Sequence, residues 1–238
     1  PEADAELLAM TVECLLASGL REFQVSVGQV DYFKSLLREA DLDEEAEEHL
    51  QELIAEKNYF GVEELVGEQK LDPKLSTALQ QIPHLFGARE ILDKASSLTD
   101  NPVAVRAVER LKKIYEILKI YGYEKYISFD FGMVSKIQYY TGIIFQAYTY
   151  GTGEPIVKGG RYNDLLKHFG TPAASIGLVI VIDSLLTALS RQKIETFQEE
   201  EPYILTYTED MLEEAVAKAQ RLRKEGRRVA LRKVKEGC

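Results

Sequence analysis

The stretch FDFGMVSKIQYYTGIIFQAYTYGTGEPIVKGGRYNDLLKHFG, residues 129–170, decides the fold of this chain. Apolar and polar residues alternate over 127–131 and again over 143–148, and a Gly-Thr-Gly turn at 151–153 precedes a third extended segment at 156–158. A period of two is typical of half-buried strands. Because only short segments separate them, the three strands are predicted to be sequential and antiparallel, as in a meander.

Five tyrosines and a Gly-Gly pair in this stretch suggest a pocket for a small polar ligand. Phenol rings give apolar walls with hydrogen-bonding tips, and residues without a Cβ let backbone N–H groups come close to a ligand. On periodicity alone, the tyrosines also fit a half-exposed sheet, and Gly159-Gly160 also fits a bulge or a tight turn. The five are Tyr139, Tyr140, Tyr148, Tyr150 and Tyr162.

The residues before this stretch are mostly helical in pattern. Residues 1–18 place apolar side chains on one helical face, and residues 23–27 alternate as a half-buried strand. Helical spacing then continues almost throughout 31–121, with an acidic run that we interpret as a solvated helix face. Asn101-Pro102 predicts a helix start, because Asn caps a helix and Pro fits its first turn, and Gly122 predicts the end of that helix.

This pattern predicts a core of residues 1–52 and 122–192, interrupted by a helical insertion over 53–121. Within 175–189 the sequence SIGLVIVIDSLLTAL passes from a predicted buried strand into an apolar helix. A polar linker is predicted over 193–200. Residues 201–238 follow as a small unit with a single strand-helix-strand pattern, which cannot cover both faces of a sheet, so this domain is expected to be very small or cut short.

Composition excludes several classes of function. Twenty-nine basic and 39 acidic residues give a net charge of −10, which argues against a nucleic acid as partner. Cys14 and Cys238 lie far apart and no Cys/His cluster is present, so neither a zinc site nor a disulfide framework is expected, and no cofactor is predicted. No apolar run approaches a membrane span and no signal pattern opens the chain, so a cytoplasmic location is predicted.

Three blocks of sequence occur in an order that is found in a known family. They are QYYTGIIF (138–145), GGRYN (159–163) and SIGL (175–178). Over most of residues 1–192 the chain resembles histidyl-tRNA synthetases and their non-catalytic paralogue, the regulatory subunit of ATP phosphoribosyltransferase. The resemblance implies an α+β fold like that of class II aminoacyl-tRNA synthetases, with an antiparallel sheet flanked by helices, a helical insertion, and a partial C-terminal α/β unit similar to an anticodon-binding domain. It also implies that the first two class motifs precede Pro1, so that the chain is a fragment.

By this resemblance, two arginines of the synthetase are replaced. The catalytic arginine of its block Arg-Gly-Leu-Asp-Tyr-Tyr is Ser135 here, and the arginine that faces ATP in its third class motif is Ser184. Losing one preorganised charge-stabilising group costs about 10² to 10³ in rate, so little adenylate formation is expected. Gln146 and Asn163 stand where the family usually has Glu and Asp, and both bear on ligand affinity. The positions that match the histidine pocket are retained: Tyr139, Tyr140, Gly159, Gly160, Arg161 and Tyr162.

The resemblance therefore predicts a regulatory subunit that catalyses nothing alone. It would bind L-histidine, form a homodimer within a hetero-oligomer, and dock on the short-form catalytic subunit of ATP phosphoribosyltransferase in histidine biosynthesis. A coupling free energy on the order of 1–3 kcal/mol between histidine binding and activity would suffice. The alternatives are a fragment of a true histidyl-tRNA synthetase, or a synthetase-derived binding module with another ligand and partner.

Other candidate residues are expected to be structural. Cys14 is predicted to be a buried, inert thiol, and Asp130 to accept a backbone hydrogen bond at a strand end. The histidines are scattered without a nucleophile at recognisable spacing, and they are predicted to be ordinary surface or helix-end residues. They are His49, His84 and His168.

Overall fold

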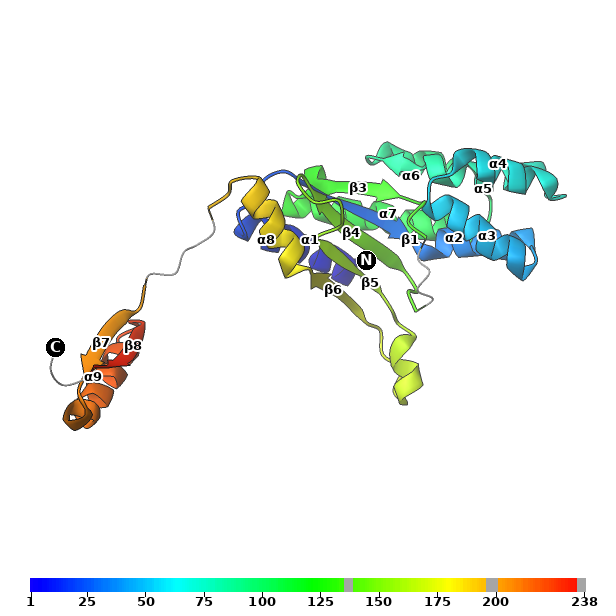
Figure 1. Cartoon of the computed structure of the whole chain (residues 1–238). Helices are drawn as coiled ribbons and strands as arrows, with labels where there is room; N and C mark the ends of the chain where they lie inside the picture. The colour runs from blue at the N-terminus through cyan, green and yellow to red at the C-terminus, as the bar shows by residue number, and fades with distance from the viewer. Residues whose placement is uncertain (135–138, 196–200, 235–238) are drawn as a thin grey trace. The chain divides into compact units, whose positions relative to one another are not determined.

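The computed structural model of the chain describes residues 1–134, 139–195 and 201–234 (Figure 1). Its contacts divide the chain after Glu195 into two compact units, and that division falls within the predicted linker, of which 196–200 lie outside the described residues.

No helix in the described ranges is both long and apolar enough to cross a membrane. In the same ranges, no group of three or more His, Cys, Asp and Glu side chains is placed to hold a metal ion.

A six-stranded sheet forms the centre of the first unit, in the order β2-β3-β1-β4-β5-β6. Strands β4 and β5 pair antiparallel as predicted, and β6 continues the sheet as a further antiparallel strand beside β5. The predicted direct pairing of β3 with β4 is wrong, because β1 lies between them, parallel to β3 and antiparallel to β4. Parallel strands need a long crossover, and the helices between β1 and β3 provide it. The strands are β1 (Phe23–Gln29), β2 (Phe86–Gly87), β3 (Ile127–Asp130), β4 (Ile143–Thr149), β5 (Val157–Arg161) and β6 (Ile176–Ile180).

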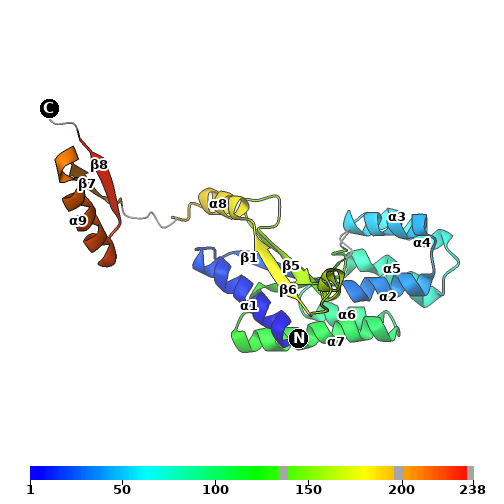
Figure 2. The same ribbon diagram turned by 90° about the horizontal axis from the view of Figure 1, so that it is seen from below.

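Eight α-helices accompany this sheet in the part of the unit that the structure describes. Helix α1 packs beside α7 and against β6, and α7 also packs against α2 and β1 (Figure 2). Short 3₁₀ turns follow α5, precede β3 and follow β5; they are η1 (Ile82–His84), η2 (Glu124–Tyr126) and η3 (Leu165–Phe169). The helices are α1 (Glu2–Ala17), α2 (Val30–Ala40), α3 (Glu44–Ala55), α4 (Tyr59–Glu68), α5 (Pro73–Gln81), α6 (Glu90–Ser97), α7 (Pro102–Tyr121) and α8 (Ile182–Arg191).

Helix α7 confirms the predicted end signals. The side-chain oxygen of Asn101 accepts hydrogen bonds from the backbone N–H groups of Val103 and Ala104, at 3.0 and 3.2 Å, which satisfies two of the free donors of the first turn. At the other end, Gly122 adopts a left-handed conformation with φ of 75°, which a glycine accepts without strain.

One hydrophobic core runs through the first unit. Leu65, Leu79 and Leu92 of the predicted insertion belong to the same cluster as Phe129 and Phe145 of the sheet. Residues 53–121 therefore share the core of the strands, and the core shows no break at the predicted boundaries.

The observed burial of the inner strand β1 and of the edge strand β6 differs from the predicted burial. Strand β1 is buried along its whole length, apart from a half-buried Gln24. Strand β6, predicted to be buried, lies at the sheet edge and is half-exposed, with Val179 63% exposed. An apolar sequence run alone does not separate a central strand from an edge strand.

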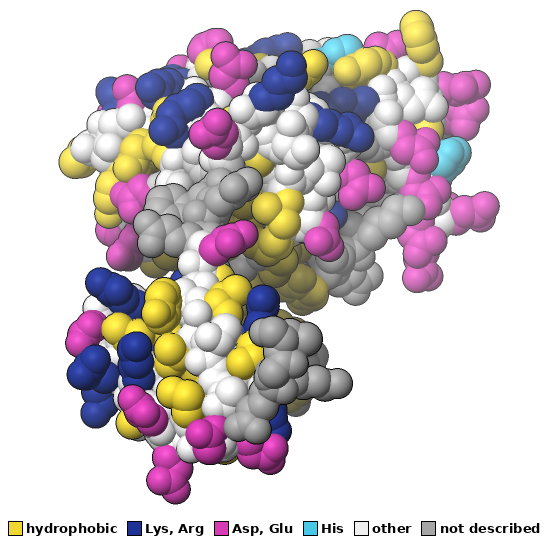
Figure 3. Space-filling model, turned by 60° about the vertical axis from the view of Figure 1, so that its left-hand side comes forward, with side chains coloured by type: hydrophobic (Ala, Val, Ile, Leu, Met, Phe, Trp, Pro, Cys, Tyr) yellow, Lys and Arg dark blue, Asp and Glu magenta, His cyan; other side chains and the backbone are white. Residues whose placement is uncertain are grey.

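The second unit has the predicted strand-helix-strand pattern. Strands β7 (Tyr203–Tyr207) and β8 (Val229–Lys233) are parallel, and the turn η4 (Glu209–Met211) and helix α9 (Leu212–Lys224) connect them. Five buried residues form its core, which is therefore small. Hydrophobic side chains lie open between charged ones on the face of this unit in Figure 3, as expected where one helix covers only one side of a sheet; the exposed ones include Tyr203, Ile204, Met211 and Leu212.

Candidate ligand-binding site

Three of the five predicted tyrosines meet at one end of the sheet. Tyr139 and Tyr140 precede β4, and Tyr162 follows β5, so the antiparallel pairing of these strands brings them together. The ring centroids of Tyr139 and Tyr140 are 4.5 Å apart, and Tyr162 meets Tyr139 edge-on at 6.0 Å. Tyr148 and Tyr150 lie at the opposite end of β4, where they are 41% and 76% exposed.

The glycines of this region make room for the tyrosine rings. A Cβ on Gly160 would lie 2.6 Å from the Tyr140 ring and 2.7 Å from the Ile143 carbonyl oxygen. A Cβ on Gly177 would lie 2.6 Å from the Tyr162 hydroxyl. The physical reason for Gly160 thus differs from the one predicted: the missing Cβ admits a side chain of the chain itself rather than a ligand.

Gly159 points to the other face of the sheet. Its Cβ would come within 2.3 Å of the Phe145 ring and 2.6 Å of the Gly177 carbonyl oxygen, so it allows close packing in the core. The Gly-Gly pair therefore has two structural roles, one on each face of β5, because successive residues of a strand point to opposite faces.

Tyr140 is the most perturbed titratable group of the cluster. Burial first, and then the hydrogen bond between its hydroxyl and that of Tyr139 at 3.5 Å, raise the pKa of Tyr140 well above its ordinary value. The phenol therefore stays neutral at physiological pH and can donate or accept a hydrogen bond.

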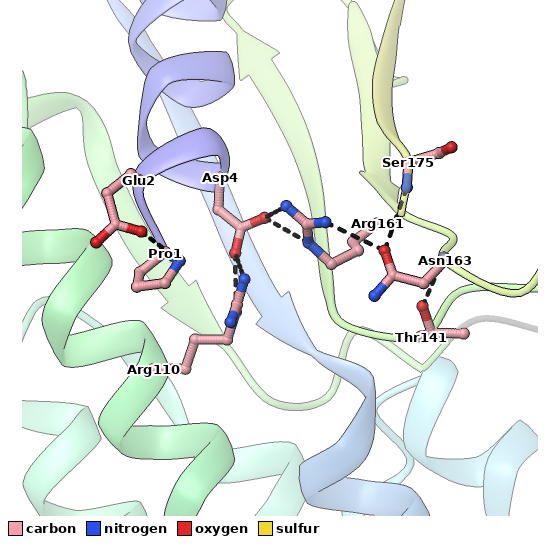
Figure 4. Close-up of polar contacts among 8 residues, drawn as sticks. All are labelled: Pro1, Glu2, Asp4, Arg110, Thr141, Arg161, Asn163 and Ser175. Carbon is pink, nitrogen blue, oxygen red and sulfur yellow. Dashed lines mark hydrogen bonds and ion pairs between the residues drawn. The ribbon is translucent and has the colours of Figure 1, made fainter. Parts of the chain in front are cut away.

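Arg161 is engaged by a buried carboxylate rather than open to solvent (Figure 4). Its Nε and a terminal nitrogen lie 2.7 and 2.6 Å from Oδ1 of Asp4, whose side chain is fully buried in the first turns of α1. The other oxygen of Asp4 accepts from Nε of Arg110 on α7, at 2.8 Å. Two guanidinium groups thus satisfy one buried carboxylate, as a buried charge requires.

Asn163 connects this network to residues 139–142, the segment before β4 that carries Tyr139 and Tyr140 and that we call the tyrosine turn. Its side-chain oxygen accepts from Arg161 at 3.1 Å and from the backbone N–H of Ser175 at 3.2 Å, while its own N–H donates to the Thr141 hydroxyl at 2.9 Å. Gln146, the other departure from the family pattern, lies further along β4, where its side-chain oxygen accepts from the Tyr148 hydroxyl.

Ser184 lies far along the sheet from these residues, in the first turn of α8. It lines a hollow of about 250 Å³ together with the loop 151–154, which follows the end of β4, and with Arg191. The Arg191 guanidinium donates to the Gly151 carbonyl at 2.7 Å and holds that loop. Ser135 and Gln138 lie outside the described residues.

The remaining candidates are structural or exposed. The prediction for Asp130 is confirmed: it accepts from the Gly132 N–H at 2.9 Å, and it also pairs with Lys57 at 3.0 Å. The prediction for Cys14 is wrong, because α1 buries the face of Leu8, Val12 and Leu15 and turns Cys14 outward. The exposed histidines of the described side chains are His49 and His84, the latter stacked on Tyr59; the His168 side chain is not described.

The sequence alone did not identify Asp4 as a candidate residue. A usable signal exists, because Asp4 lies four residues before Leu8 on the apolar face of α1. A carboxylate in line with core positions predicts a buried partner.

The family model of histidyl-tRNA synthetase matches residues 1–185 of the chain. The chain belongs to this family. It is 38% identical over 226 residues to the ATP phosphoribosyltransferase regulatory subunit of Acetivibrio thermocellus, covering 95% of this chain and 54% of that protein. The predicted synthetase-like α+β fold and the resemblance to regulatory subunits are confirmed.

Solved structures of family members agree with the fold. A Bacillus halodurans protein described as an ATP phosphoribosyltransferase regulatory subunit/histidyl-tRNA synthetase matches with a TM-score of 0.79 at 31% identity, over 98% of this chain and 59% of that chain. An ATP phosphoribosyl transferase (HisG:HisZ) complex from Thermotoga maritima matches with a TM-score of 0.56 at 21% identity, over 74% of this chain and 60% of that one, and this likeness shows the fold alone. The chain spans 54% to 60% of the length of the curated relatives that it matches.

Proposed function

We propose that this chain is part of a regulatory subunit of ATP phosphoribosyltransferase, which docks on the short-form catalytic subunit and mediates its activation and its feedback by histidine. Relatives at 32% to 38% identity over nearly the whole chain carry that name. The proposal includes a homodimer within a hetero-oligomer, and it keeps the predicted cytoplasmic location.

The observation that carries this proposal is the contrast between a formed tyrosine cluster and a missing arginine. Tyr139, Tyr140 and Tyr162 are gathered, and the last two pack over glycines, so an amino-acid ligand would meet aromatic walls with hydroxyl tips. At Ser184, where the resemblance places the arginine that faces ATP, a short hydroxyl stands instead. The proposed protein recognises L-histidine and catalyses nothing alone.

The predicted set of ligand residues divides into two roles in this proposal. The three tyrosines contact the ligand, and Gly159, Gly160 and Arg161 support them. Arg161 is assigned to support because Asp4 and Asn163 already engage its guanidinium, which is 12% exposed. A ligand carboxylate that took Arg161 would have to displace a buried carboxylate from it.

Calorimetric titration of the full-length protein with L-histidine, in complex with a short-form catalytic subunit, tests the pocket. Tyr140→Ala removes a half-buried wall of the proposed pocket and is expected to weaken histidine binding at least tenfold. Tyr150→Ala removes an exposed ring at the other end of β4 and should leave the affinity within twofold. If both variants bind like the unaltered protein, histidine does not bind this pocket.

A second candidate function is histidine activation by a true synthetase, which the match to the synthetase family model favours. ATP–pyrophosphate exchange by the full-length protein with histidine separates the two candidates, and robust exchange would exclude a purely regulatory role.

Mixing the full-length protein with the short-form phosphoribosyltransferase tests the proposed partner. If no complex forms and the rate of the catalytic subunit does not change, the regulatory proposal is wrong and another binding module is indicated.

A further inference from the structure

We propose that Asp4 is a positioning residue for the tyrosine pocket, and that it acts through Arg161. This inference rests on the proposed function, because it concerns the affinity of that pocket for histidine. It assigns to the first turns of α1 a part in ligand binding, although Asp4 precedes Tyr139 by 135 positions in sequence.

The first step is the buried charge. Asp4 is fully buried, and each of its oxygens accepts from a different guanidinium, Arg161 at 2.6–2.7 Å and Arg110 at 2.8 Å. A guanidinium is planar and donates in a fixed fork, so two of its nitrogens on one oxygen restrict both the position and the orientation of the Arg161 side chain. Asp4 therefore determines where Arg161 lies.

The second step leads from Arg161 to the turn that carries Tyr139 and Tyr140. The aliphatic part of Arg161 passes beside Gly142, where a Cβ would be 3.0–3.3 Å from it. The Arg161 carbonyl accepts from the Thr141 N–H at 2.8 Å. Both the backbone and the side chain of Arg161 therefore contact the tyrosine turn.

The third step leads to Tyr162. Arg161 donates to Asn163, and Asn163 bonds both the Thr141 hydroxyl and the Ser175 N–H, while the Tyr162 N–H donates to the Ser175 carbonyl at 2.8 Å. Figure 4 shows this sequence of contacts from α1 through Arg161 to Asn163, Thr141 and Ser175. Tyr162 lies between Arg161 and Asn163 in the chain, so the same contacts fix the residues on both sides of it.

The chain contains a matched control for this inference. Arg110 binds the same carboxylate as Arg161, but it comes from α7 on the other side of Asp4 (Figure 4). Arg161→Met and Arg110→Met each remove one guanidinium from Asp4 and leave the other. Both are expected to lower the melting temperature, whereas only Arg161→Met breaks the connection to the tyrosines.

The experiment is calorimetric titration of the full-length protein with L-histidine. Arg161→Met and Asp4→Asn are each expected to weaken binding at least tenfold, and Arg110→Met by less than twofold. The double variant Asp4→Asn/Arg161→Met should bind no more weakly than Arg161→Met, because the two residues act in series. NMR spectra of protein labelled in its tyrosine rings should show shifted Tyr139, Tyr140 and Tyr162 signals in Arg161→Met and unshifted ones in Arg110→Met.

Each outcome decides a distinct point. If the unaltered protein does not bind histidine, the proposed pocket fails, and the tyrosine spectra still decide whether Asp4 and Arg161 position the rings. If Arg110→Met and Arg161→Met weaken binding alike, the network acts only through overall stability and the inference is wrong. If Asp4→Asn binds histidine as the unaltered protein does, Asp4 does not position the pocket.

Discussion

The two ends of strand β4 differ in how tightly their side chains are held. At its start, the Tyr140 ring occupies the space left by Gly160, and the turn before the strand is tied to a buried ion pair. At its end, Ser184 and the loop 151–154 line an open hollow beside a half-exposed helix. The comparison indicates that the end with Tyr139 and Tyr140 depends on close packing, whereas the end near Ser184 imposes few constraints on the fold.

The largest effect is expected from removing the carboxylate that supports the tyrosine end. Asp4→Ala leaves two guanidinium groups without their buried partner, and the free energy of unfolding should fall by about 3–5 kcal/mol. Urea unfolding at pH 7 measures it. Asp93→Ala is the control, because Asp93 pairs with Arg89 and Lys112 but is 58% exposed, and solvent screening should make its loss far less costly than that of Asp4. Equal losses would show that burial does not distinguish the two ion pairs.

The next-largest loss of stability is expected at Gly160, whose missing Cβ leaves room for the Tyr140 ring. In Gly160→Ala the new methyl group would meet the Tyr140 ring and the Ile143 carbonyl at 2.6–2.7 Å, so we expect a loss of about 1–3 kcal/mol in unfolding free energy and weaker histidine binding. Gly153→Ala at the other end of β4 is the control, since no atom lies within 4 Å of its added Cβ. If Gly160→Ala were as stable as Gly153→Ala, the ring would not be packed against Gly160.

Local sequence signals predicted both ends of helix α7. Asn101-Pro102 and Gly122 fixed the ends of α7 because capping and left-handed backbone depend on the residue itself. The antiparallel pairing of β4 with β5 was also predicted, because a short connection favours neighbouring antiparallel strands. The place of β1 was not, since pairing with β3 across a long crossover depends on contacts far apart in sequence.

The candidate site shows the same limit. The resemblance pointed to Tyr139, Tyr140 and Tyr162, whose rings lie near one another in the structure, but periodicity could not separate them from Tyr148 and Tyr150. The partner of Arg161 was not predictable from its own neighbours, because Asp4 is 157 positions away. A buried ion pair is a property of the packed fold, and sequence shows only that a charged residue lies on an apolar face.

A substitution at the open end should have little effect on recognition. Ser184→Arg introduces the arginine that the proposed correspondence with the synthetase places there, in a loosely packed hollow, and we expect the histidine affinity of the full-length protein to stay within twofold. We also expect no ATP–pyrophosphate exchange, because in the same proposed correspondence the second arginine position is still occupied by Ser135. Calorimetry and the exchange assay measure the two results. A large change in histidine affinity would mean that the two ends of β4 are coupled.

The smallest effect is a change in alkaline stability that reports on Tyr140 itself. Burial first, and the Tyr139 hydrogen bond second, raise the pKa of Tyr140 above the ordinary value of about 10. The folded state therefore disfavours the phenolate, so the contribution of Tyr140 to stability is complete below pH 10 and is lost as the pH rises from there toward the folded-state pKa.

In Tyr140→Phe the decline of the unfolding free energy above pH 10 should be shallower than in the unaltered protein. In Tyr139→Phe, which keeps the burial and removes the hydrogen bond, the change should be smaller. Burial also raises the pKa of Tyr32, but that residue is common to all three proteins and gives the same background. If Tyr140→Phe declined as steeply as the unaltered protein, the Tyr140 ring would be solvated, and the start of β4 would be as open as its end.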